Sequence, residues 1–210
     1  MKKFALPILI IITILAVTMI LIFMPADRLL SKIPVIKSFY SNTNLSITTP
    51  NSKSEIEVNG KDYGETSQVI GDLEEGTYQV KLSRISGNEA FYDPQTFTIE
   101  LTRNTESVIS VELGPQNIKS GYMLFYTPAK SIKKSAGSLS VSTEVPGVSI
   151  YIDNEYISEV PLKKHEISAT NHVIKITAEG YETIEVPVII NEDYHLNIVA
   201  YLMPIPTELI

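Results

Sequence analysis

The sequence predicts an all-β protein: two small antiparallel β-sandwich domains preceded by one transmembrane α-helix. Three observations support this fold class. The chain opens with an uncharged apolar run, most of the remainder is an internal repeat, and the repeated segments alternate apolar with polar residues. No helical periodicity occurs beyond the apolar run, so every later element is expected to be a strand or a turn.

The apolar run extends from Phe4 to Met24 and contains no charged residue. At about 1.5 Å per residue, a helix of this length spans the roughly 30 Å hydrocarbon layer of a bilayer. A cleaved signal peptide is the alternative, but its apolar region is normally shorter and ends in a cleavage site of small residues. Met24, Pro25 and Ala26 fit that pattern poorly, so we expect an uncleaved membrane anchor at residues 4–24.

The flanking charges leave the orientation of this anchor nearly balanced. Two lysines precede the run, and three basic residues, Arg28, Lys32 and Lys37, follow it closely. Long domains translocate largely regardless of charge, whereas a three-residue tail with two lysines translocates poorly. We therefore expect a single-pass cell-membrane protein with residues 1–3 as a cytoplasmic tail, residues 25–43 as a juxtamembrane linker and the body outside the cytoplasm.

The internal repeat defines the domains. The run from Leu45 matches the run from Leu139 at an offset of 94 residues, and after a longer loop in the first copy the match resumes at an offset of 89. We place domain 1 at 44–113 and domain 2 at 138–202. Residues 114–137 are then a linker, and residues 203–210 form a C-terminal tail.

Each matched segment has the period-two pattern of a half-buried antiparallel strand, as in "YQVKL" and "FTIEL" of the first copy and "HVIKI" and "IEVPVII" of the second. Short strands at this spacing, with turn residues between them, are typical of immunoglobulin-like sandwiches. The linker differs, because its run "GYMLFY", Gly121 to Tyr126, is continuously apolar. It is either an extra edge strand or pad that docks one sandwich on the other, or an exposed contact patch for another protein.

Charge and composition exclude several classes of function. Each repeat is acidic, with 12 acidic and 5 basic residues in 44–113 and 10 and 3 in 138–202, whereas the linker carries four lysines and no acid. Nucleic acid is therefore not an expected partner, because it binds through basic patches. There is no cysteine, which excludes disulfides, thiolate zinc sites and a cysteine nucleophile.

One glycine-bearing loop, "EVNGKDYGET" around Asn59-Gly60 and Gly64, could be a phosphate loop or a turn. It lacks the spacing of either phosphate-binding glycine motif, and no helix is predicted to follow it. The equivalent stretch of the second copy has Asp153-Asn154 and no glycine. A hairpin turn is therefore predicted at both places, since Asn-Gly and Asp-Asn tolerate positive φ.

Tests for catalytic and metal chemistry yield no assignment. The three histidines, His165, His172 and His195, lack the pair spacing of a zinc site, and no G-x-S-x-G nucleophile motif is present. The clusters Asp153-Asn154-Glu155 and Asn191-Glu192-Asp193 could bind calcium loosely but lack a regular ligand loop. A carboxylate pair for glycoside hydrolysis cannot be assigned from spacing. We therefore expect no enzyme, no cofactor and no catalytic, cofactor-binding or metal-binding residues.

Both copies resemble the PEGA domain, a short β-sandwich repeat. The second copy carries "VPGVSIYIDNEYISEVPL" and the pair Gly180-Tyr181, and the first carries "IEVNGKDYGET" and "EEGTYQVKL". The P-x-G-A turn that names the family is degenerate in both copies, and His172 stands where the pattern has tyrosine. The resemblance implies a PEGA-like sandwich for each repeat in a prokaryotic surface or envelope protein, and it carries over no catalytic residue.

Together these observations predict a non-catalytic, membrane-anchored protein of a prokaryotic envelope. Its two PEGA-like sandwiches are expected to serve as an interaction, spacer or scaffold module that contacts a protein or an envelope polymer. The alternative is an extracytoplasmic sensor or regulatory subunit that binds a sugar, peptide or cation and acts through a membrane partner.

Overall fold

The computed structural model describes residues 43–88, 91–130 and 134–206 of the chain. Residues from Thr43 onward form one compact unit, and its described part contains strands but no helix. The all-β prediction is therefore confirmed for this part of the chain. None of the described residues forms a helix that is long and apolar enough to cross a membrane. The anchor predicted at residues 4–24 lies outside the described residues.

Fifteen strands make up the described part. Repeat one contains β1 (Asn44–Thr48), β2 (Ser54–Val58), β3 (Lys61–Glu65), β4 (Gln68–Ile70), β5 (Gly76–Arg84), β6 (Gln95–Leu101) and β7 (Glu106–Leu113). The segment between the repeats contains β8 (Lys119–Pro128). Repeat two contains β9 (Ala136–Thr143), β10 (Ser149–Ile152), β11 (Glu155–Glu159), β12 (Leu162–Ser168), β13 (Asn171–Thr177), β14 (Ile184–Ile189) and β15 (Tyr194–Tyr201).

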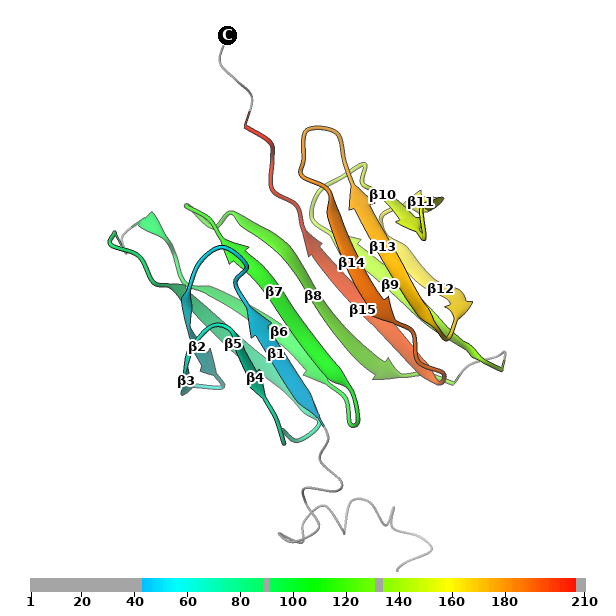
Figure 1. Cartoon of the computed structure of the whole chain (residues 1–210), viewed down its shortest axis with the longest axis horizontal. Helices are drawn as coiled ribbons and strands as arrows, with labels where there is room; N and C mark the ends of the chain where they lie inside the picture. The colour runs from blue at the N-terminus through cyan, green and yellow to red at the C-terminus, as the bar shows by residue number, and fades with distance from the viewer. Residues whose placement is uncertain (1–42, 89–90, 131–133, 207–210) are drawn as a thin grey trace, which may run out of the picture. The chain divides into compact units, whose positions relative to one another are not determined.

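These strands form one large sheet and two small ones (Figure 1). The large sheet has the order β12-β9-β15-β8-β7-β1-β4, and the small sheets have the orders β3-β2-β5-β6 and β11-β10-β13-β14. The sequence offset matches β1 with β9, β4 with β12 and β7 with β15. Outward from β8, the strands of repeat one (β7, β1, β4) and the equivalent strands of repeat two (β15, β9, β12) therefore follow in the same order. Each repeat contributes three strands to the large sheet and four to a small sheet of its own.

Strand β8 joins the repeats. It pairs antiparallel with β7 on one side and with β15 on the other. Because successive side chains point to opposite faces, Leu124 and Tyr126 enter the core of repeat two, whereas Met123 enters the core of repeat one and Phe125 packs against it. A strand buried on both faces reads as a continuous apolar run, which explains why "GYMLFY" does not alternate.

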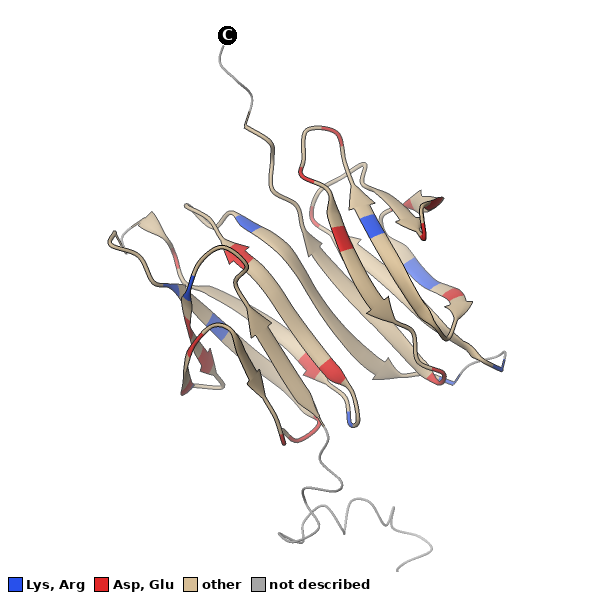
Figure 2. Cartoon of the chain, viewed as in Figure 1, with Lys and Arg blue, Asp and Glu red and all other residues tan. Residues whose placement is uncertain are grey.

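The two hydrophobic cores lie on opposite faces of the large sheet. Met123 pairs with Ile109 of β7 in one row of side chains, and both belong to the core of repeat one. Leu124 pairs with Ile198 of β15 in the next row, and both belong to the core of repeat two. Since adjacent rows face opposite ways, the small sheet of repeat one covers one face and that of repeat two covers the other. Apart from Lys119, the central strands β8 and β15 carry no charged side chain (Figure 2).

Two expectations from the sequence are wrong. The run Gly121–Tyr126 is not an exposed contact patch, because Met123 is 5% exposed and Leu124 and Tyr126 are each 6% exposed. Nor is it an edge strand, since it pairs on both sides. The docking alternative is confirmed, because the run joins the two repeats and contributes to both cores. The sheets are also not purely antiparallel: β1 pairs parallel with β7, and β9 pairs parallel with β15. The chain reaches the parallel partner only after passing through the small sheet, which supplies the long connection that parallel pairing needs.

Candidate functional site

The glycine-bearing loop of repeat one is a hairpin turn. Asn59 and Gly60 have φ angles of 48° and 80°, and they connect β2 to β3 in a two-residue turn. Asp153 and Asn154 occupy the same place in repeat two, with φ angles of 51° and 71°. Both central residues have the positive φ that a type I′ turn requires, so the predicted turns are confirmed.

Each turn is held by the same contact to the neighbouring strand. The Asn59 Oδ1 atom accepts a hydrogen bond from the backbone N–H of Gln79 at 2.8 Å. In repeat two, Asp153 Oδ1 accepts from the N–H of Val173 at 2.9 Å. This bond, and after it the bond from His172, holds the pKa of Asp153 below its ordinary value. The side-chain oxygens at these positions therefore bind the protein's own backbone.

His172 lies in a group that resembles a catalytic triad, but its contacts are those of a structural residue. Its Nδ1 atom is 2.6 Å from Asp153 Oδ2, and its Nε2 atom is 3.1 Å from Ser168 Oγ. Nε2 also lies 3.0 Å from the Ser168 backbone oxygen, which can only accept a hydrogen bond. The Tyr78 hydroxyl of repeat one makes the equivalent contact, donating to the Glu74 carbonyl four residues earlier at 3.0 Å. His172 Nε2 therefore donates to this carbonyl, as the Tyr78 hydroxyl does to Glu74, so Nε2 has no lone pair with which to accept the Ser168 proton.

Of the other two histidines, His165 is part of β12 and His195 is part of β15, and β9 lies between these two strands in the large sheet. His195 is buried between two hydroxyls, with Nδ1 2.7 Å from Ser138 Oγ and Nε2 2.9 Å from Ser140 Oγ. Burial, and to a smaller extent the Lys164 ammonium, lower the pKa of His195. Both ring nitrogens of His195 therefore lie against serine hydroxyls.

The two acidic clusters proposed as loose calcium sites are parts of turns. Asp153 and Asn154 form the hairpin described above. In the other cluster, Glu192 Oε1 accepts a hydrogen bond from the N–H of Ser135 at 3.1 Å, and the Asp193 carbonyl accepts from Ala129 at 2.9 Å. Within residues 43–88, 91–130 and 134–206, no three histidine or carboxylate side chains gather in a group that could hold a metal ion.

The outward face of the small sheet of repeat two has an unusual composition. We call it the tyrosine face and define it by six residues: Tyr151, Tyr156, Val173, Lys175, Pro187 and Ile189. Tyr156, Val173 and Ile189 are 53%, 44% and 58% exposed. The rings of Tyr151 and Tyr156 contact each other edge to face, with centroids 5.5 Å apart. A shallow depression of about 420 Å³ adjoins the face beside Val173 and Pro187.

The corresponding face of repeat one is polar throughout. The same offsets and strand pairings place Glu57, Asp62, Gln79, Lys81, Thr98 and Glu100 at the six equivalent positions. Only the lysine is retained. Lys81 Nζ lies 3.7 Å from Glu57 Oε2, whereas Lys175 Nζ lies over the Tyr151 ring, 5.9 Å from its centroid. The fold of both repeats is the same, so folding alone does not require the apolar and aromatic side chains of the tyrosine face.

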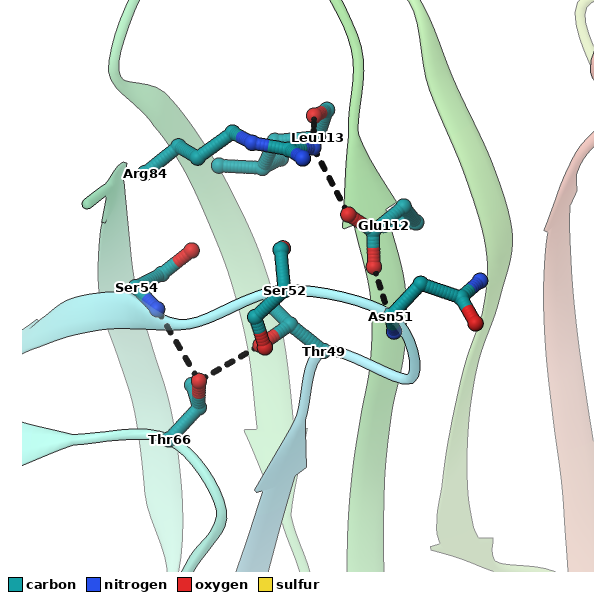
Figure 3. A network of polar contacts seen from close by, with 8 residues as sticks. All are labelled: Thr49, Asn51, Ser52, Ser54, Thr66, Arg84, Glu112 and Leu113. Atoms are coloured by element: carbon teal, nitrogen blue, oxygen red, sulfur yellow. Dashed lines mark hydrogen bonds and ion pairs between the residues drawn. The ribbon is translucent and has the colours of Figure 1, made fainter. Parts of the chain in front are cut away.

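Repeat one has a polar network of its own at the end where β1, β5 and β7 meet (Figure 3). Arg84 of β5 reaches Glu112 of β7, with Nη1 and Oε1 2.7 Å apart, and donates to the Leu113 carbonyl. Glu112 also accepts from the backbone N–H of Asn51 at 2.9 Å. At the offset positions of repeat two, Ala178 and Tyr201 replace Arg84 and Glu112. The network ties the two sheets of repeat one together and presents no side chain arranged for chemistry.

The structure thus defines a tandem β-sandwich protein whose two repeats share a central strand. Comparison with protein families agrees with this class: the family model of the PEGA domain matches residues 42–117 and 136–205. The chain therefore belongs to the PEGA-domain family, as its motifs indicate. Strand β8 lies between the two matched segments. No curated protein matches the chain.

Proposed function

We propose that this protein is a non-catalytic, membrane-anchored module of a prokaryotic cell envelope, and that the tyrosine face of repeat two is its contact surface for another protein. The family, whose domains usually occur in extracellular proteins and are not known as catalytic, supports the first part. The apolar run at residues 4–24 supports the anchor. The observation that carries the second part is the contrast between the tyrosine face and the polar face of repeat one.

The composition of the tyrosine face favours a protein partner over an envelope polymer. Val173, Pro187 and Ile189 offer aliphatic surface, which packs against apolar side chains but cannot hydrogen-bond sugar hydroxyls. The carboxylates of Asp153, Glu155 and Glu185 belong to the same turn and strands, so an anionic polymer would be repelled. A partner surface that combines apolar side chains with surrounding lysines or arginines is complementary to both features.

Site-specific photo-crosslinking in native membranes tests this contact. A benzophenone amino acid in place of Tyr156 should give one discrete protein adduct, and Ile189→Glu should abolish it, because the charge disrupts the apolar contact. The matched control carries the same crosslinker at Asp62, the equivalent position of repeat one. An adduct of carbohydrate character would assign the face to a polymer, and equal labelling from both positions would contradict the proposal.

The location requires its own test. Protease added to intact spheroplasts should cut the repeats, as it cuts an external control protein. Protection of the repeats while the control is cut would show that the proposed orientation is wrong.

A second candidate function, an extracytoplasmic sensor or regulatory subunit, is favoured by one specific observation. A polar pocket lies beside His195, on the opposite side of repeat two from the tyrosine face.

A further inference from the structure

The pocket beside His195 lies on the face of the large sheet that points away from the core of repeat two. Leu139 of β9 and Leu196 of β15 point into that core, so their neighbours Ser138 and His195 point the other way. The parallel pairing of β9 with β15 places His195 directly opposite Ser138. The small sheet of repeat two therefore cannot cover these side chains.

The pocket has a volume of about 470 Å³, which is within the usual range for small-molecule sites. Strands β8, β9, β12 and β15 and the residues that follow β8 contribute to its lining. The polar residues of the lining are Thr127, Lys130, Ser138, Lys164, Glu166 and His195. Pro128 and Ala129 add apolar surface.

A β-bulge directs Lys164 into the lining. The pairing of β12 with β9 shifts between Leu162 and His165, and Lys164 lies inside this irregularity with a φ of 47°. A lysine rarely adopts this conformation, and bulges that re-aim a side chain are common beside functional sites. In repeat one the pairing of β4 with β1 is regular at the corresponding place. The bulge is thus a feature of repeat two that the shared fold does not require.

One of the two neutral tautomers of His195 leaves a hydroxyl donor available to a ligand. The lowered pKa keeps the imidazole neutral at pH 7, so one nitrogen donates and the other accepts. Ser140 Oγ accepts from the Lys164 N–H at 3.0 Å and can donate its own proton to His195 Nε2. His195 Nδ1 then donates to Ser138 Oγ. In this arrangement the Ser138 hydroxyl proton remains for an acceptor in the pocket.

The charge of the lining favours an anion. Lys130 and Lys164 are cationic, His195 is neutral, and Glu166 is the single carboxylate among the lining residues. At the equivalent positions of repeat one, Glu106 replaces His195 and Asn44 replaces Ser138. A carboxylate at the position of His195 would repel an anion, so the corresponding face of repeat one is unsuited to the same ligand.

We propose that this pocket binds a small organic carboxylate about the size of a monosaccharide or dipeptide. Lys130 and Lys164 bind the carboxylate, and the Ser138 and Thr127 hydroxyls bind its other polar groups. An acidic sugar and the carboxyl end of a peptide both supply such a carboxylate. This inference is independent of the tyrosine face, which lies on another surface.

Calorimetric titration of the full-length, detergent-solubilised chain tests the proposal with three probes: glucuronate, N-acetyl-alanyl-alanine and neutral glucose. Binding of glucuronate alone identifies an acidic sugar, binding of the dipeptide alone identifies a peptide carboxylate, and binding of both shows that the carboxylate itself is recognised. Binding of neither, or glucose binding as tightly as glucuronate, overturns the proposal.

Variants of adjacent lysines provide matched controls. Lys164→Gln should weaken binding about tenfold through the loss of one charge-assisted contact, while Lys163→Gln should change it less than about twofold. Lys164→Gly should weaken binding equally without lowering the melting temperature, because glycine accepts the positive φ. A folded Lys164→Gly protein that binds like the unchanged chain would contradict the assignment.

Discussion

Repeat one and repeat two have the same strand order and the same hairpin turn, yet their outward-facing side chains differ. Repeat one presents charged, amide and hydroxyl groups where repeat two presents tyrosine, valine, proline and isoleucine. Repeat one also closes one end with the Arg84–Glu112 network, whereas repeat two has Ala178 and Tyr201 there. Since one fold accommodates both sets, the difference must be explained by something other than folding. We attribute recognition to repeat two and support to repeat one.

The largest expected effect concerns the strand that the repeats share. Leu124→Ala and Met123→Ala should each destabilise the protein by about 2–5 kcal/mol, because each removes a buried side chain. Hydrogen exchange should separate them: Leu124→Ala should first expose amides of repeat two, and Met123→Ala those of repeat one. If both variants loosened the same repeat, β8 would not serve two cores.

A smaller effect is expected from the network peculiar to repeat one. Arg84 and Glu112 are 22% and 13% exposed, so Arg84→Ala should cost about 1–2 kcal/mol in urea denaturation. A double-mutant cycle with Glu112→Ala should give a coupling of about 1 kcal/mol. The exposed pair Lys53–Glu65, at 2.9 Å, provides the control and should couple by less than about 0.5 kcal/mol. Equal couplings would show that the network is an ordinary surface contact.

The hairpin turns should respond to substitution in opposite directions. Asn154→Gly should stabilise repeat two by about 0.5 kcal/mol, because glycine adopts a φ of 71° without strain. Gly60→Asn should destabilise repeat one by a similar amount. Denaturation midpoints measure both changes. A loss of stability in Asn154→Gly would mean that the Asn154 side chain makes a contact that outweighs its backbone strain.

The least pronounced effect is a pH dependence that only repeat two should show. Burial lowers the pKa of His195 below its ordinary value of 6.5, so the unfolded chain binds this proton more readily. The contribution of His195 to stability is therefore present above pH 6.5 and is lost as the pH falls toward the folded-state pKa. Thermal unfolding from pH 8 to 5 should show this loss, and His195→Asn should reduce the slope. If the slope of stability against pH were unchanged in His195→Asn, the pH dependence would come from other groups.

The sequence predicted the parts of this fold that depend on local pattern. The alternation of apolar and polar residues identified the strands. The turns were identified because Asn59-Gly60 and Asp153-Asn154 tolerate positive φ angles. The docking role of β8 was only one of three alternatives, because residues 114–137 have no counterpart to compare at either offset, and a short apolar run suits an edge strand as well as a shared one. The parallel pairing of β9 with β15 likewise depends on long-range contacts.

The candidate sites differ in how far the sequence could have located them. The tyrosine face could have been located from the sequence. At the two offsets, Tyr151 aligns with Glu57 and Ile189 aligns with Glu100, so the outward positions differ in polarity. The pocket beside His195 could not be located from the sequence. Its residues come from four strands whose pairing is unknown before folding, and nothing local signals the bulge that re-aims Lys164.

Exchange of the two outward faces tests most directly whether repeat two is the recognition half. One chain receives the residues of repeat one through Tyr151→Glu, Tyr156→Asp, Val173→Gln, Pro187→Thr and Ile189→Glu, and a second chain carries the reverse changes in repeat one. The measurement is the mass of the detergent-solubilised complex from native membranes. We expect the first chain to run without its partner and the second chain to bind additional partner. A complex of unchanged mass in the first chain, with its melting temperature retained, would contradict it.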